Sequence, residues 1–155
     1  MSRDDGRQLE EPNIRIAGFQ IWIHGAQLVD SKNYFEGDWL RATVHCGAEG
    51  SEVWLRNAIL KSSELEKWMI SSEEVLRSQE VSSVFECEQE DFSVILHARS
   101  NDELEMEVKI TPNSRSQQHS YKFEIIQKDL VQLIASCGKV LKQYSIGDKN
   151  ENTGT

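Results

Sequence analysis

The feature that most constrains this chain is a change of hydrophobic period near residue 127. Apolar and polar side chains alternate in two stretches, Leu104–Ile110 and Tyr121–Ile126, as they do in half-buried strands. From Leu130 to Leu141 the apolar residues instead recur every three or four positions, which is the period of an amphipathic helix. The pattern therefore predicts a strand that runs directly into a helix at Gln127.

Earlier in the chain, the same patterns predict five more strands and one more helix. The strands are expected at residues 14–28, 38–46, 52–60, 84–88 and 92–98, and the helix at residues 63–79. Ser63 and Glu66 have the spacing of a capping box at the start of this helix. Strands in runs, with two helices, favour an α+β fold of order βββαββββα. We expect one sheet of about seven strands with both helices on one face. The sheet is antiparallel, either throughout or with a mixed edge.

Pairing of the later strands can be predicted from the apolar residues that must share a face. Short loops place Phe85 opposite Val94 and Leu96 opposite Met106, so that apolar side chains meet apolar partners. A loop at residues 111–120 then leads to the last strand, and a simple extension of the register pairs Glu107 with Glu124. Like charges that face each other directly are destabilising, so either this last register is wrong or the face keeps its charge for a partner.

The length of 155 residues suggests one domain, which we place at residues 13–145 between flexible polar tails at residues 1–12 and 146–155. No apolar run is long enough to span a bilayer, and the N-terminal segment lacks the apolar stretch of a signal peptide. We therefore expect a cytoplasmic protein. Its three cysteines lie far apart at inward-facing positions, so we expect free, buried thiols.

The net charge of −9 favours a basic protein as partner and disfavours nucleic acid and anionic membranes. Acidic residues concentrate between residues 63 and 107. On the predicted outer face of the sheet they give a candidate partner-binding set of Glu86, Glu88, Glu105 and Glu107. The alternative is a charged strand face that is only solvated.

The sequence contains no recognisable catalytic, metal-binding or phosphate-binding motif. No two histidines have the spacing of a zinc pair, and neither a G-x-S-x-G elbow nor a glycine-rich phosphate loop occurs. We expect no catalytic residues, no metal and no cofactor. Trp22, Trp39 and Trp54 suggest either a stacking platform for a ligand or ordinary packing. His97 is expected opposite Glu105, as an acid–base pair or as an exposed polar pair.

The order of these landmarks resembles that of the WapI family of immunity proteins from bacterial polymorphic toxin systems. The resemblance covers about residues 14–144 and rests on Asp38-Trp39-Leu40, on Leu65 with Trp68, on Tyr121, Phe123 and Ile125, and on Gln127, Leu130, Leu133 and Ile134. It implies a cytoplasmic, non-catalytic protein that neutralises a cognate toxin, commonly a nuclease and therefore basic. Two alternatives stay open at this point. One is a scaffold or adaptor with another protein partner, and the other is an enzyme or small-ligand binder that uses the tryptophans and His97.

Overall fold

A computed structural model describes residues 10–26, 39–88, 91–100, 102–113 and 116–144, so most of both predicted tails lies outside the described residues. In chain order the elements are β1 (Ile14–Ile16), β2 (Phe19–Ala26), β3 (Trp39–Ala48), β4 (Ser51–Lys61), α2 (Ser62–Leu76), β5 (Ser82–Glu86), β6 (Phe92–Ser100), β7 (Glu103–Asn113), β8 (Gln117–Ile126) and α3 (Gln127–Tyr144). The α+β class is confirmed. Neither described helix is both long and apolar enough to cross a membrane.

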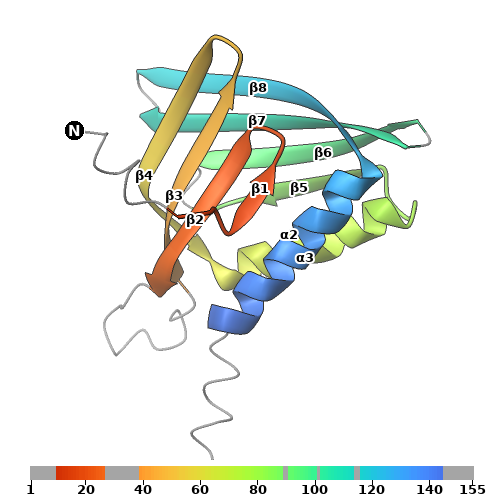
Figure 1. Ribbon diagram of the computed structural model, residues 1–155, viewed down its shortest axis with the longest axis horizontal. Helices are drawn as coiled ribbons and strands as arrows, with labels where there is room; N and C mark the ends of the chain where they lie inside the picture. Colours follow the sequence, from red (N-terminus) through yellow and green to blue (C-terminus); the bar gives the residue numbers. More distant parts are fainter. Residues whose placement is uncertain (1–9, 27–38, 89–90, 101, 114–115, 145–155) are drawn as a thin grey trace, which may run out of the picture.

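The strands form two antiparallel sheets rather than the single sheet of seven strands that we expected. Sheet A has the order β1-β2-β3-β4 and sheet B the order β5-β6-β7-β8. Figure 1 shows the β3–β4 hairpin crossing over β7 and β8, and the hydroxyls of Ser51 and Tyr121 lie 2.9 Å apart at this crossing. The prediction failed because alternation shows which side chains face a core, but not whether a sheet or a helix covers them. The first predicted strand is also divided, since a turn at Ala17-Gly18 separates β1 from β2.

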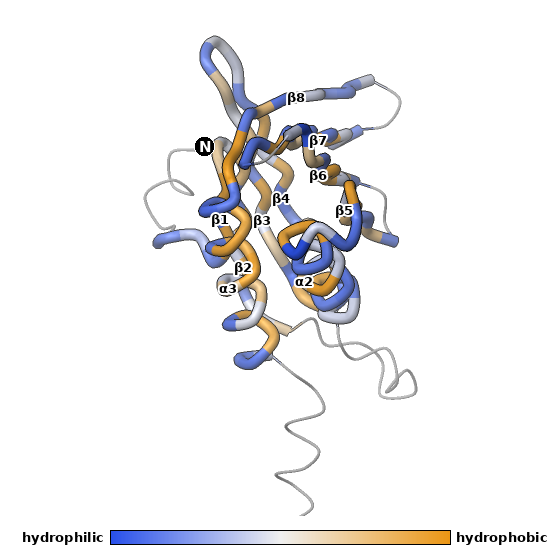
Figure 2. Tube along the Cα trace, turned by 90° about the vertical axis from the view of Figure 1, so that its right-hand side faces the viewer, coloured by the Kyte–Doolittle hydropathy of each residue, from blue (hydrophilic) through white to orange (hydrophobic). Residues whose placement is uncertain are grey.

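Both helices close the region where the two sheets diverge. Helix α2 packs along β5, α3 packs along β1, and the helices contact each other. Figure 2 shows apolar residues spread along the strands of both sheets and along both helices. Buried residues of both sheets and both helices form one core cluster, which has Trp68 among its largest fully buried side chains. We expected both helices to cover one face of a single sheet. Instead, α2 packs on sheet B and α3 packs on sheet A, and the two helices contact each other.

Strand pairing within sheet B confirms the predicted register as far as β7. Phe85 faces Val94 and Leu96 faces Met106. The predicted pair of Glu107 with Glu124 is wrong by two residues, because Glu107 faces Lys122 instead. The loop expected at residues 111–120 is mostly strand, and an irregularity between residues 110 and 113 shifts the register. Sequence alternation does not reveal such a shift, because it leaves every apolar side chain on the same face.

Helix α2 begins one residue earlier than predicted and ends three residues earlier, at Leu76. Its capping interaction involves Lys61 and Glu64, whose Oε1 accepts a hydrogen bond from the Lys61 backbone nitrogen at 2.8 Å. The predicted Ser63 and Glu66 box is therefore wrong, because the chain enters the helix directly from β4. Two adjacent serines in the middle of α2 do not break it, since the Ser71 hydroxyl lies 2.5 Å from that of Ser83 on β5.

All three cysteines are free and buried, as predicted. Burial raises the pKa of the Cys46 thiol to about 12 and that of the Cys137 thiol to about 12. The pKa of Cys87 is raised as well, first by burial and then by the nearby carboxylates of Glu64 and Asp91. Thiols with such pKa values are protonated at neutral pH, and the protonated form is a poor nucleophile and a poor metal ligand.

Candidate protein-binding surfaces

The outer face of sheet B carries an apolar pair, on β5 and β6, next to charged residues on β7 and β8. Val84 on β5 faces Ile95 on β6, Ile95 faces Glu107 on β7, and Glu107 faces Lys122 on β8. Val84 is 47% exposed, which is unusual for a valine in a strand, while Ile95 is half-buried. Protein interfaces typically combine apolar side chains with charged residues at their rim.

Three of the four predicted glutamates lie on this outer face. Glu86 is exposed on β5, whereas Glu105 and Glu107 lie two strands away on β7 and are half-buried. Glu105 forms an ion pair with Arg99 at 3.2 Å, and Glu107 accepts a hydrogen bond from the Ser120 hydroxyl at 3.2 Å. The face is less acidic than the sequence suggested, because Arg99, Lys109 and Lys122 also lie on it.

Glu88, the fourth predicted residue, is not brought together with Glu105 and Glu107. It follows the end of β5, where its carboxylate lies 2.8 Å from the Lys61 Nζ. Its backbone nitrogen donates to the Glu64 Oε2 at 2.7 Å. These contacts hold Glu88 at the start of α2, at the opposite end of β5 from Glu105. The alternation of Glu86 with Glu88 gave no sign that the strand stops between them.

The outer face of sheet A is lined with aromatic residues. Trp22 stacks on Trp54 with ring centroids 5.6 Å apart, and the centroid of the His45 ring lies 4.3 Å from that of Trp54. The Trp22 indole nitrogen donates to the Glu10 carbonyl oxygen at 2.6 Å, and only 8% of the residue is exposed. Of the two possibilities left open above, these contacts favour packing of the tryptophans on one another. Trp39 lies further along the face, with the Lys61 Nζ 4.9 Å from its ring.

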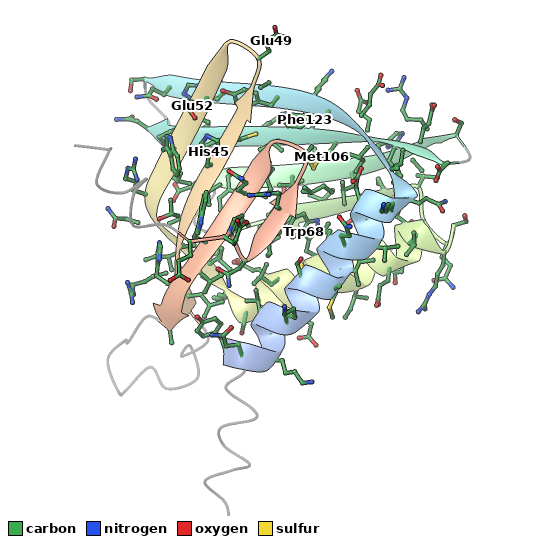
Figure 3. All side chains as sticks on the ribbon, viewed as in Figure 1. His45, Glu49, Glu52, Trp68, Met106 and Phe123 are labelled. Carbon is green, nitrogen blue, oxygen red and sulfur yellow. The ribbon has the colours of Figure 1, made fainter. Side chains whose placement is uncertain are left out.

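Both ring nitrogens of His45 make side-chain contacts on this face, and Figure 3 shows His45 beside Glu52. Its Nε2 lies 2.6 Å from Glu52, and its Nδ1 lies 2.9 Å from the Gln20 side chain. With the Gln20 amide turned so that its nitrogen donates to Nδ1, the amide oxygen accepts from Arg15. Both ring nitrogens are engaged, so this histidine is not placed to act as a general base. An open hollow of about 600 Å³ adjoins it, lined by glycines of the β3–β4 hairpin.

His97 faces Glu105 across β6 and β7, as predicted, and is exposed. Glu105 pairs with Arg99, so the partner of the Glu105 carboxylate is a guanidinium and not the imidazole. Within the described part of the chain, no group of three or more His, Cys, Asp or Glu side chains could hold a metal ion.

Comparison with known proteins agrees with the landmark order described above. Residues 12–145 match the family described as immunity protein WapI-like. Searches of curated proteins and of solved structures gave no match. The matched range covers both sheets and both helices, which is most of the chain. The chain belongs to the immunity protein WapI-like family.

Proposed function

We propose that this protein neutralises a cognate toxin by binding it, without catalysis. The observation that carries the proposal is membership of an immunity protein family over residues 12–145. Both ring nitrogens of His45 are engaged in side-chain contacts, and the Glu105 carboxylate opposite His97 pairs with Arg99. Neither histidine is therefore arranged as a general base, which supports binding as the mode of action. Residues 13–145 act as a single domain in this proposal, and the protein meets its toxin in the cytoplasm.

The docking surface in this proposal is the outer face of sheet B. Val84 and Ile95 supply apolar contact, and Glu86, Glu105 and Glu107 supply carboxylates around them. Glu88 adds negative charge beyond the end of β5, although its pairing with Lys61 reduces its contribution. A toxin that acts on nucleic acid is basic where it holds its substrate, and a carboxylate-rimmed face complements such a surface. Neither nucleic acid nor a membrane is a partner in this scheme.

Association kinetics test the docking surface. The binding partner in the experiment is the cognate toxin domain, which is sought among the genes next to this one and produced as a catalytically inactive variant. Reversing Glu105 and Glu107 to lysine should slow association at least tenfold at low ionic strength and flatten its salt dependence, since opposite charges accelerate encounter and salt screens them. The matched control reverses Glu11 and Glu49, which are exposed on the side of sheet A and give the same change in net charge.

Circular dichroism and the midpoint of urea unfolding must first show that both double variants fold. Glu105 and Glu107 are only half-buried, so we expect changes in unfolding free energy within about 1 kcal/mol of the unmodified protein. If the Glu105/Glu107 variant binds with unchanged kinetics at low salt, or if the control slows association equally, the outer face of sheet B is not the docking surface. If neither the unmodified protein nor the control variant binds the toxin domain, the proposed function itself is contradicted.

A further inference from the structure

Each of the two described sheets ends in two edge strands, and three of these four edges are protected. Strand β1 is only three residues long and has α3 packed along it, while α2 packs along β5. Strand β4 contains a β-bulge, at which Asn57 has a left-handed φ of 64°. Very short strands, bulges and covering helices are common ways of keeping an exposed edge from pairing with another chain.

Strand β8 lacks all of these features in the part of the chain that the structure describes. It is ten residues long, no residue in it has a positive φ, and its register with β7 is unbroken from His119 to Ile126. Figure 1 shows β8 at the border of sheet B, with β7 on one side, and no described strand pairs with its other side. The backbone N–H and C=O groups on that side therefore lack strand partners among the described residues.

Two contacts of β8 define the stretch of this edge that is open to pairing. Where the β3–β4 hairpin crosses β8, the hydroxyls of Ser51 and Tyr121 lie 2.9 Å apart. At the end of the strand, the Ile126 backbone nitrogen donates a hydrogen bond to the Asp129 Oδ2 at 3.0 Å. Residues 122–125 lie between these contacts and form the open stretch.

The outward side chains of this stretch are one cation and one anion, Lys122 and Glu124, and both are exposed. Among the described residues, none forms an ion pair or a hydrogen bond with either side chain. Glu124 faces Glu105 on β7, and Glu105 pairs with Arg99. Like charges that face each other across strands are destabilising, so a cation on the open side of β8 would relieve this repulsion.

We propose that β8 pairs antiparallel with β8 of a second copy of this chain, about a two-fold axis at Phe123. Lys122 of each copy then lies opposite Glu124 of the other copy, and the two Phe123 residues face each other. Opposite residues of an antiparallel pair point to the same face, so both ion pairs lie on the outer face of sheet B. The two four-stranded sheets become one continuous sheet. This self-association is independent of toxin neutralisation and goes beyond it.

The two charges favour a second copy in this one register. Moving the axis by one residue places Lys122 opposite Lys122, or Glu124 opposite Glu124, and both arrangements are repulsive. A two-fold dimer uses the same patch on both copies, so the patch must complement itself, and this edge does so only with the axis at Phe123. Exposed ion pairs contribute little affinity, so we expect them to set the register of a weak dimer that main-chain hydrogen bonds hold together.

Sedimentation equilibrium and hydrogen exchange of the full-length chain test the dimer. The average mass should rise from 17.8 kDa toward twice that value as the protein concentration increases from about 1 µM to about 1 mM. Over the same range, exchange at the backbone amides of residues 122–125 should slow. The amides of β4, the other long edge strand, serve as an internal control and should not change.

Charge reversal separates this register from general attraction. K122E and E124K should each weaken self-association at least tenfold, because each creates two like-charge pairs in the dimer. The double variant K122E/E124K restores complementary pairs and should dimerise like the unmodified chain. An equimolar mixture of the two single variants should also dimerise, since each supplies the charges that the other lacks.

Matched controls make the same changes in net charge at exposed positions of the helices. K139E on α3 and E66K on α2 should change self-association less than twofold. Circular dichroism must first show that every variant folds. The proposal is overturned if the unmodified chain stays monomeric over this concentration range, or if β4 is protected and β8 is not. It is also overturned if neither the double variant nor the mixture recovers association.

Discussion

Trp68 offers the most discriminating test of the core, because its buried ring and its indole nitrogen make opposite contributions to stability. The ring is fully buried and stacks on Phe85 at 4.5 Å, with the Phe19 ring edge-on at 6.4 Å. Emptying such a site costs ~3–5 kcal/mol, so Trp68→Ala should lower the free energy of unfolding by that amount. However, no described residue accepts a hydrogen bond from the Trp68 Nε1–H. An unsatisfied buried donor costs about 1–3 kcal/mol.

Trp68→Phe separates these two contributions. It deletes the five-membered ring, a loss equivalent to two or three buried CH₂ groups or about 2 kcal/mol, but it also removes the unsatisfied donor. The two effects nearly cancel, so Trp68→Phe should lie within about 1 kcal/mol of the unmodified protein. Urea unfolding followed by circular dichroism measures both variants. A loss below about 1 kcal/mol for Trp68→Ala would refute the packing assignment, and a loss above about 3 kcal/mol for Trp68→Phe would show that the indole N–H is bonded.

Three further predictions concern other parts of the fold. All three thiols should label slowly in the folded protein and promptly in denaturant, and a disulfide found in freshly purified protein by mass spectrometry would contradict this. Gly18→Ala should destabilise by about 3 kcal/mol or more in urea unfolding, because its Cβ would lie 2.1 Å from the Gly47 carbonyl oxygen, while Gly50→Ala meets open space and should cost only about 1–2 kcal/mol for its left-handed φ. Burial, and then Arg41, lower the pKa of His24 from 6.5, so the unfolded chain binds a proton that the folded chain resists as the pH falls below 6.5. Stability should therefore decline below that pH, and His24→Gln should reduce the decline; an unchanged pH profile would refute the assignment.

The local elements were predictable because their side chains repeat with a clear period. The strand that becomes helix α3 at Gln127 was located correctly, as was the register that joins Phe85 to Val94. Alternation was sufficient there because a slip of one residue would turn every apolar side chain to solvent. Starts and ends were less predictable, and the helix cap at Lys61 shows why. Its capping carboxylate, Glu64, also binds the Glu88 backbone, a contact between residues distant in sequence.

The arrangement of the sheets was beyond the reach of periodicity. Val44 lies in sheet A and Val108 in sheet B. The alternation of apolar and polar residues around them would be the same whether a helix or the opposite sheet covered them. The candidate surfaces show the same limit. Glu105 and Glu107 were placed on an outer face correctly, but Lys122 was not expected opposite Glu107, because that pairing depends on the register of β8.

Titration of toxin activity against the concentration of this protein tests the central claim most directly. The cognate toxin domain of the proposed function is held in its active form at a concentration well above the expected dissociation constant, and its residual activity is measured as the protein is added. Neutralisation by binding predicts a linear loss of activity that ends at a fixed, near-equimolar ratio and is reversed when the complex is dissociated. Inactivation by far less than an equimolar amount would indicate catalysis, and undiminished activity at excess protein would contradict the proposed function.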